Sequence, residues 1–191
     1  MKLLFVADPL QSFKISKDST FAMMRCAQAR GHAVWATEPR WLHWRQGTTV
    51  QAQAHALTLT GLQPSWYIAG ATQRVGLEDF DAVVMRKDPP LDNEYFYATH
   101  LLSHAQRHGA RVFNSPKALR EHPEKLAILE FPEFIAPTLV TRFSGDVIAF
   151  HAEYRDIILK PLDGMGGKGI FRVREDGLNL GSIVETLNRE G

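Results

Sequence analysis

The sequence has 191 residues, enough for one large domain or two small ones, and 45% of them are hydrophobic, which is sufficient for a sizeable core. A formal net charge of +1, with no basic run interleaved with aromatic residues, gives no electrostatic case for binding nucleic acid or an anionic membrane. The single cysteine, Cys26, excludes an internal disulfide and suits a reducing compartment. After Lys2, only residues 3–7 are apolar before Asp8, too few for a signal-peptide core or a membrane span, so we expect a cytoplasmic protein.

The N-terminal segment predicts a strand, a helix and a second strand. Residues 3–7 form a continuous apolar run of strand length, and residues 32–37 predict a second strand. Between them, residues 19–30 predict a helix that Asp18 caps and Gly31 ends, with Cys26 among its buried small side chains. A strand, helix and strand in this order predict a parallel sheet covered by helices.

The remaining elements alternate between strands and helices. Residues 41–68 are rich in Thr, Val, Trp and Tyr and predict an excursion into one or two hairpins. Strands are expected at residues 81–86, 111–114 and 138–141, and helices at 94–107, 116–121, 123–130, 144–154 and 182–189. Prolines open the helices at 116 and 123, and Ser144 is expected to cap the one that follows it. The turn at His122-Pro123 is the candidate domain boundary.

Polar residues follow several of the predicted strands. Asp8 leaves the first strand, residues 86–88 (Arg-Lys-Asp) leave the strand at 81–86, and Asn114 leaves the next. Ligands of open α/β sheets collect at the carboxyl ends of strands, so these groups are expected to converge on one crevice. The alternative is turn chemistry, because Asp before Pro favours a turn.

Residues 156–174 give the most informative pattern, an apolar strand, a lysine, a glycine-rich loop and a second apolar strand. Gly164, Gly166 and Gly169 fit G-x-G-x-x-G, but a strand follows at 170–173 where a dinucleotide site needs a helix. The loop is not a Walker A loop either, because Lys168 is followed by glycine. The pattern therefore predicts a hairpin flap whose backbone N–H groups approach the phosphates of a triphosphate.

Lys160 stands at the end of the first of these strands. Alternation puts its side chain on the same face as Ile158, which would set an ammonium group beside an apolar wall, as a nucleotide site requires. The alternative is a flexible hairpin loop with a surface lysine.

One helix carries a histidine stripe, His100, His104 and His108. The spacing could align imidazoles on a metal ion, but the stripe lies opposite the apolar face and has no carboxylate partner. A solvated or subunit-contacting surface is therefore favoured. The tryptophans in and around the hairpin region are expected to serve packing there or at a subunit contact.

Four segments closely resemble bacterial glutathione synthetases, in the same order and spacing. They are Lys-Asp-Ser-Thr-Phe-Ala-Met-Met (17–24), Met-Arg-Lys-Asp-Pro-Pro-Leu-Asp (85–92), Glu-Lys-Leu (124–126) and Ile-Ile-Leu-Lys-Pro-Leu-Asp-Gly-Met-Gly-Gly (157–167). The resemblance covers essentially the whole chain. It implies an ATP-grasp ligase in which ATP phosphorylates the carboxylate of γ-glutamylcysteine and the glycine amine attacks the acyl phosphate, giving glutathione, ADP and phosphate.

The resemblance also implies a fold and site residues. The fold is an N-terminal Rossmann-like, pre-ATP-grasp, parallel-sheet domain at 1–122, which binds substrate, and the first part of an ATP-grasp domain at 123–191. Asp18, Ser19 and Arg86 face the peptide substrate. The nucleotide site comprises Lys125, Lys160, Asp163, Gly164, Met165, Gly166, Gly167, Lys168 and Gly169, with Lys160, Gly166 and Gly167 at the phosphoryl transfer.

The family pattern extends past this sequence. The resemblance implies that the magnesium ligands and the glycine site lie beyond Gly191, that this is the N-terminal three-fifths of a longer chain, and that the enzyme is a homo-oligomer. Lys168-Gly169 replaces smaller residues of the family pattern. Two alternatives stay open: a related ATP-grasp ligase with another carboxylate and amine, and a non-catalytic binding or assembly fragment.

Overall fold

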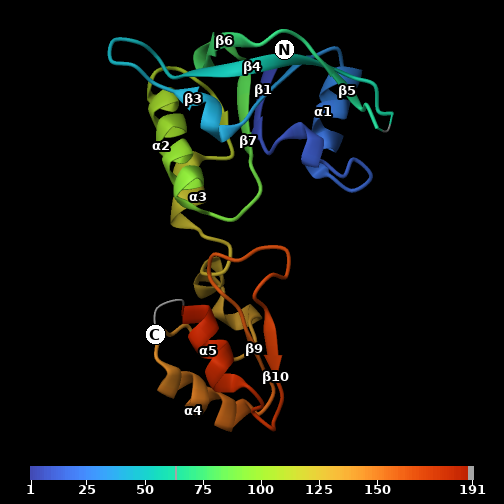
Figure 1. Ribbon diagram of the computed structural model, residues 1–191. Coiled ribbons are helices and arrows are strands. Elements are labelled where there is room, and N and C mark those ends of the chain that lie inside the picture. The colour runs from blue at the N-terminus through green and yellow to red at the C-terminus, as the bar shows by residue number, and fades with distance from the viewer. Residues whose placement is uncertain (63, 189–191) are drawn as a thin grey trace. The chain divides into compact units, whose positions relative to one another are not determined.

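The computed structural model describes residues 1–62 and 64–188 and divides the chain into two compact units, Met1–His122 and Pro123–Gly191 (Figure 1). Each unit has a hydrophobic core of its own. No helix among the described residues is long and apolar enough to cross a membrane.

The first unit is built on four parallel strands in the order β2-β1-β7-β8. These strands are β1 (Lys2–Ala7), β2 (Ala33–Thr37), β7 (Ala82–Arg86) and β8 (Val112–Phe113). The apolar runs of the sequence predict all four. A parallel arrangement needs crossover connections, and α1 (Ser19–Ala29) and α2 (Asn93–Arg107) supply two of them, while α3 (Pro116–Glu121) follows β8.

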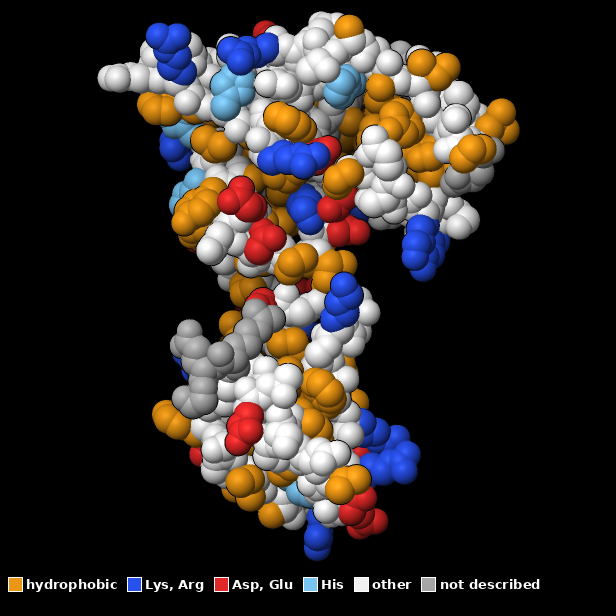
Figure 2. All heavy atoms as spheres, viewed as in Figure 1, with side chains coloured by type: hydrophobic (Ala, Val, Ile, Leu, Met, Phe, Trp, Pro, Cys, Tyr) orange, Lys and Arg blue, Asp and Glu red, His pale blue; other side chains and the backbone are white. Residues whose placement is uncertain are grey.

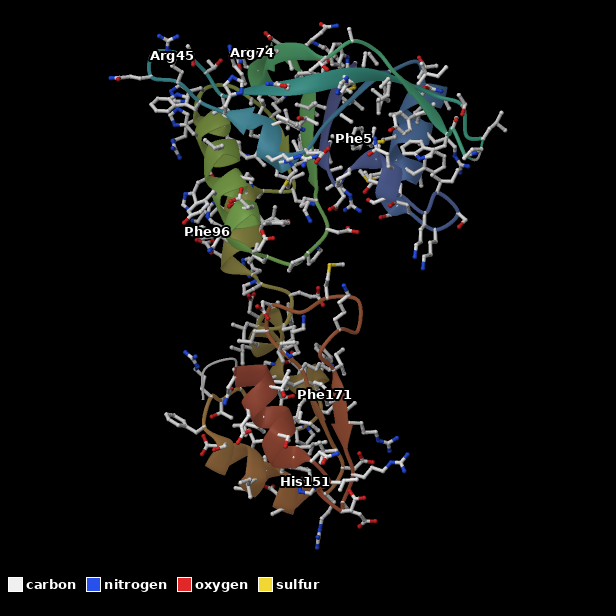
Figure 3. The ribbon with its side chains drawn as sticks, viewed as in Figure 1. Phe5, Arg45, Arg74, Phe96, His151 and Phe171 are labelled. Atoms are coloured by element: carbon white, nitrogen blue, oxygen red, sulfur yellow. The ribbon has the colours of Figure 1, made fainter. Side chains whose placement is uncertain are left out.

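The two long helices of this unit cover opposite faces of the sheet (Figure 1). Successive side chains of a strand point to opposite faces, and β1 shows the result. Leu4 and Val6 pack in the cluster that contains Leu102 of α2, whereas Phe5 packs in the cluster that contains Met24 of α1 (Figure 3). The sheet is therefore buried on both sides, which fixes the positions of its strand ends.

The hairpin region joins this sheet and does not stand apart from it. It contains β3 (Leu42–His43), β4 (Gln51–Leu59), β5 (Tyr67–Ala69) and β6 (Gln73–Gly76). β4 pairs antiparallel with β2 and also pairs with β3, β5 and β6, so the described residues form an eight-stranded mixed sheet. The predicted α/β class is confirmed. The prediction was a parallel sheet, whereas the observed sheet is mixed because the hairpin strands join it. Trp66 packs against Phe13, Phe21 and Tyr67, as the packing interpretation of the tryptophans predicts.

The second unit contains a two-stranded antiparallel sheet, β9 (Ile157–Leu159) with β10 (Phe171–Val173). The unit also contains helices α4 (Ser144–Tyr154) and α5 (Leu180–Asn188). Side chains of the two strands and of α5 form a small core of Ile157, Val173, Leu180 and Val184. His151 on α4 is hydrogen-bonded through Nε2 to the carbonyl oxygen of Arg174, 2.7 Å away, just after β10 (Figure 3).

Several local expectations in this unit are wrong. Residues 123–130 are not an α-helix: turns lead into 3-10 segments at Ala127–Glu130 and Pro132–Phe134. Proline disfavours the helical conformation of the residue before it, so Pro132 stops a helix from continuing through Phe131. Residues 138–141 are not a strand, because within the described residues the β9–β10 sheet has no third strand beside it.

Three further details differ from the expectations. The N-cap of α4 is Phe143, and the hydroxyl of Thr141, not Ser144, accepts a hydrogen bond from the Phe143 N–H at 3.0 Å. The last helix begins at Leu180, and Arg189 of the predicted span lies outside the described residues. Cys26 is exposed, because the buried stripe of α1 runs through positions 20, 21, 24 and 27 and position 26 falls outside it.

Candidate functional site

The carboxyl ends of β1 and β7 lie side by side, with Ala7 opposite Arg86 in the sheet register. Asp8 follows directly. Its carboxylate accepts from the Lys87 ammonium at 2.9 Å and from the Asp88 N–H at 2.8 Å. Lys87 also donates to the Asp88 carbonyl oxygen at 2.7 Å. The expected convergence of these strand ends is confirmed. The ion pair between Lys87 and Asp8 links the residues that follow the two strands.

Arg86 is held differently. Its Nε donates to the Thr20 hydroxyl at 3.2 Å, and its Nη2 donates to the Ser19 hydroxyl at 2.7 Å. Both hydroxyls belong to the first turn of α1, so the start of this helix and the end of β7 meet at the guanidinium. Within the described residues no carboxylate pairs with Arg86. Its remaining N–H groups can therefore donate to an anionic ligand.

Asp18 has a defined structural role beside this arginine. Its Oδ1 accepts from the Phe21 N–H at 2.9 Å and caps α1, as predicted. The cap fixes the helix turn that presents Ser19 to Arg86. Asn114, the third expected group, donates from Nδ2 to the Met85 carbonyl oxygen at 3.2 Å, one residue before Arg86.

Tyr95 is a neighbour of this site that the sequence analysis missed. It is buried in the first turn of α2, and burial raises its pKa, while Arg86 lowers it and the carboxylates of Asp88 and Asp8 raise it further. The phenol therefore stays protonated at neutral pH within reach of these charges. The sequence contains one signal for Tyr95: it lies in the first turn of the helix that follows residues 86–88.

The glycine-rich loop connects β9 to β10 in the second unit. Its base is closed by close packing: a Cβ at Gly164 would lie 2.7 Å from Cγ of Pro161 and 3.1 Å from the Lys168 carbonyl oxygen, and one at Gly169 would lie 3.1 Å from the same Cγ. Its tip has left-handed backbone, with φ of +61° at Gly166 and +80° at Gly167, and open space beside both. Glycine is thus required at the base for room and at the tip for conformation.

The tip leaves backbone donors for a ligand. In the described part of the chain, the N–H groups of Gly166 and Gly167 donate to no backbone carbonyl. Successive free N–H groups at left-handed glycines make a concavity suited to phosphate oxygens. This geometry agrees with the predicted phosphate flap and gives a reason for each glycine.

Lysines lie on both sides of this loop. The Lys125 ammonium donates to the Gly164 carbonyl oxygen across 39 residues of sequence, so the turn at 123–126 contacts the base of the loop. Lys160 follows β9 and is exposed, as Ile158 is, in keeping with the alternation predicted for this strand. Lys168 and Met165 are exposed within the loop, which also contains Asp163.

Among residues 1–62 and 64–188, no three His, Cys, Asp or Glu side chains gather into a metal site. This finding includes the histidine stripe, in which the His104 and His108 rings contact each other at 4.2 Å. A separate ion pair joins the two ends of the β9–β10 hairpin, with Arg172 donating to both oxygens of Asp156 at 2.9 and 2.6 Å. These bonds hold the pKa of Asp156 below its usual value.

Comparison with known proteins matches both units to one family. Residues 1–120 match the model of the prokaryotic glutathione synthetase N-terminal domain, and residues 124–191 match that of the prokaryotic glutathione synthetase ATP-grasp domain. The chain is 56% identical over its whole length to glutathione synthetase from Ralstonia nicotianae and 50% identical to that from Nitrosomonas europaea. It spans 59% and 60% of those proteins.

Solved structures share the fold at much lower identity. The D-cycloserine synthetase DcsG has a TM-score of 0.61 at 15% identity, over 99% of this chain and 55% of its own. The D-alanyl-alanine synthetase A of Vibrio cholerae has a TM-score of 0.56 at 13% identity, over 96% and 54%. Both comparisons support the fold alone.

Proposed function

The chain belongs to the prokaryotic glutathione synthetase family, and we propose that this protein is a glutathione synthase, which uses ATP to join γ-glutamylcysteine to glycine. In this reaction the cysteinyl carboxylate takes the γ-phosphoryl group of ATP and ADP is released. The glycine amine then attacks the acyl phosphate, phosphate leaves with the electron pair of its bond to carbon, and the amine loses a proton. Relatives named glutathione synthetase, 46–56% identical, support this assignment.

The glycine-rich loop is the observation that carries the proposal. Its base is closed around Pro161, and the N–H groups of Gly166 and Gly167 at its tip donate to no backbone carbonyl of the described chain. We assign the β- and γ-phosphates of ATP to this tip. The loop also contains Asp163, Gly164, Met165, Lys168 and Gly169.

Lys125 and Lys160 supply positive charge from two different segments, the turn at 123–126 and the residue after β9. In the structure Lys125 donates to the Gly164 carbonyl oxygen. Charge-assisted hydrogen bonds contribute about 1.5–3 kcal/mol each, so either lysine can account for a large share of ATP affinity.

The peptide substrate is assigned to the ends of β1 and β7. Arg86 offers three of its five N–H donors to a substrate carboxylate, because two already donate to Ser19 and Thr20. Asp18 contributes through the helix cap that positions Ser19. Lys87 is not assigned to substrate, because Asp8 already neutralises it.

Magnesium accompanies ATP in this reaction class by neutralising the transferring phosphate. Among the described residues no three His, Cys, Asp or Glu side chains gather, so no cluster of protein ligands marks a place for this ion. We therefore assign no magnesium ligand here, and no step above depends on one. The assignment to cytoplasm and to a homo-oligomer is part of the same proposal.

Substitution of Lys160 tests the nucleotide assignment. Lys160→Ala should weaken ATP binding by roughly ten- to a hundredfold, because one charge-assisted contact is lost. Lys117→Ala is the matched control, since that lysine lies in the first unit, is largely exposed and forms an ion pair with Glu121. Unchanged ATP affinity in Lys160→Ala, with both variants folded, would contradict the assignment.

A further inference from the structure

The first unit contains a pocket beside α1 to which no role has been assigned above. Its volume is about 560 Å³, which is typical of sites for small molecules. Segment 13–17, which precedes α1, forms part of its wall, and the other parts come from α1 itself and from the turn after β4. The lining residues that decide its chemistry are Phe13, Lys14, Lys17, Phe21 and Arg25.

This pocket is distinct from the cluster at the ends of β1 and β7. Ser19 and Thr20 of α1 accept hydrogen bonds from Arg86 in that cluster. Phe21 and Arg25 of the same helix line the pocket. Successive residues of an α-helix are turned by about 100°, so the mean directions of these two pairs of side chains are roughly opposite. A ligand in the pocket would therefore leave the site assigned to the peptide substrate free.

The pocket concentrates positive charge. Lys14, Lys17 and Arg25 contribute three cations, and none of the lining residues is acidic. Among residues 1–62 and 64–188, no carboxylate forms an ion pair with any of the three. The whole chain has a formal net charge of only +1, so the attraction for anions is local and suits a small ligand better than a long polyanion.

Three cations around one pocket suit a phosphate better than a carboxylate. A phosphate monoester brings a charge of about −1.5 to −2 near pH 7 and three strong acceptor oxygens, so it can accept from several donors at once. A carboxylate brings a single negative charge and two oxygens.

The aromatic part of the lining is held in place by packing. The Phe13 ring stacks on Trp66 with a centroid distance of 5.6 Å, and the Phe21 ring meets Trp66 edge-on at 5.2 Å. The Arg25 guanidinium lies 5.7 Å from the centroid of the Phe21 ring, a cation–π distance that orients this cation. In Figure 2, a Lys or Arg side chain projects at the right of the first unit, below hydrophobic side chains that lie over α1 and β5. Because the rings are ordered before binding, a ligand that covers them costs little conformational entropy.

We propose that this pocket binds a small phosphate ester with a planar ring, of the chemical class of a mononucleotide. The phosphate accepts from Lys14, Lys17 and Arg25, and the ring lies against Phe13 and Phe21. The site is additional to the ATP site assigned to the glycine-rich loop, and it does not depend on the ligase assignment.

The test is a titration of the intact, isotope-labelled protein, followed through its backbone amide NMR signals. Adenosine 5′-monophosphate (AMP) is the probe, and inorganic phosphate and adenosine are tested separately as its two halves. AMP should shift the amide signals of residues 13–17 and of Gly61 until they saturate. Phosphate should shift the same signals with about tenfold weaker affinity, because it lacks the ring, and adenosine should bind more weakly than AMP because it lacks the charge. AMP at the glycine-rich loop shifts residues 164–169 instead, so the two sites are measured separately.

Two variants and a matched control separate the contributions of charge and ring. Arg25→Gln should raise the dissociation constant for AMP by about three- to tenfold, because one solvent-exposed charged contact is lost. Arg30→Gln is the control, since Arg30 is exposed at the end of the same helix, does not line the pocket and carries the same charge; its effect should stay within about twofold. Phe13→Leu keeps an apolar side chain and loses the ring, so it should weaken AMP binding by about threefold or more and leave phosphate binding unchanged. Circular dichroism melts check that all three variants fold.

Unchanged amide signals at residues 13–17 with millimolar AMP would overturn the proposal. Equal weakening by Arg25→Gln and Arg30→Gln would also overturn it, because the overall charge of the protein would then account for the binding. If adenosine alone or phosphate alone binds as tightly as AMP, the ligand is not a phosphate ester that uses both parts of the pocket.

Discussion

Arg86 and Lys87 are adjacent cations at the end of β7 with different partners, and this difference predicts different kinetic defects. Arg86 donates to two hydroxyls and keeps three N–H donors for a ligand, whereas Lys87 is paired with Asp8 at 2.9 Å. We expect Arg86 to act on peptide-substrate binding and Lys87 to act on stability.

The magnitudes follow from these contacts. Arg86→Gln removes the charge from one or two hydrogen bonds to a substrate carboxylate, about 1.5–3 kcal/mol, so the KM for γ-glutamylcysteine should rise by roughly ten- to a hundredfold. The KM for ATP should stay within about twofold, because the nucleotide is assigned to other residues. Arg86→Lys keeps the charge but loses the planar fork, so it should recover only part of the loss.

Lys87→Gln is the matched control on the neighbouring residue. It leaves a half-buried Asp8 carboxylate without its ammonium partner, which should lower the free energy of unfolding by about 1–3 kcal/mol. The melting temperature should therefore fall by several degrees. The KM for the peptide should change by less than about threefold. Steady-state kinetics with each substrate varied, together with thermal melts, measure both effects. Arg86→Gln with an unchanged peptide KM, or Lys87→Gln with the larger KM effect, would refute the assignment of roles.

Three further predictions concern the second unit. Gly167→Ala should slow ADP formation and cost about 1–2 kcal/mol of stability, because the φ of Gly167 is +80°. Gly145 lies in helix α4 with open space around it, so Gly145→Ala should stabilise the protein by about 0.5–1 kcal/mol. Lys125→Ala should speed hydrogen exchange in the glycine-rich loop without ATP, since the loop loses a contact at its base; equal exchange in both proteins would argue against that contact. The hydrogen bond from Arg172 lowers the folded-state pKa of Asp156, so the stabilisation from this ion pair is present above the unfolded pKa and is lost as pH falls through the folded pKa. In Asp156→Asn the melting temperature should no longer show this fall at acid pH. If the variant loses melting temperature at acid pH as the wild type does, the ion pair is not the cause.

Local signals in the sequence predicted much of the fold. The strand at residues 3–7 and the helix capped by Asp18 follow from apolar runs and from cap chemistry, which act over a few neighbouring residues. The meeting of Asp8 with Lys87 follows from one topological rule, that parallel strands end at the same edge. The glycine-rich loop could also be predicted from the sequence, because its glycines stand where the backbone needs room or a positive φ.

The parts that sequence reasoning missed depend on contacts between distant residues. No local pattern shows that Lys125 lies against Gly164, or that β4 joins the edge of β2 and turns a parallel sheet into a mixed one. Cys26 sits one position off the buried stripe of its helix, a distinction too fine for a pattern of small and apolar residues. Tyr95 gains its place near Arg86 only when α2 packs beside β7.

The most direct test of the central claim is ADP release by the purified intact protein, with ATP and magnesium present and the two acceptors supplied separately and together. The proposed function predicts turnover that requires both γ-glutamylcysteine and glycine, with glutathione formed in equal amount to ADP. No ADP with both acceptors, or ADP formation that depends on a different carboxylate, would contradict it.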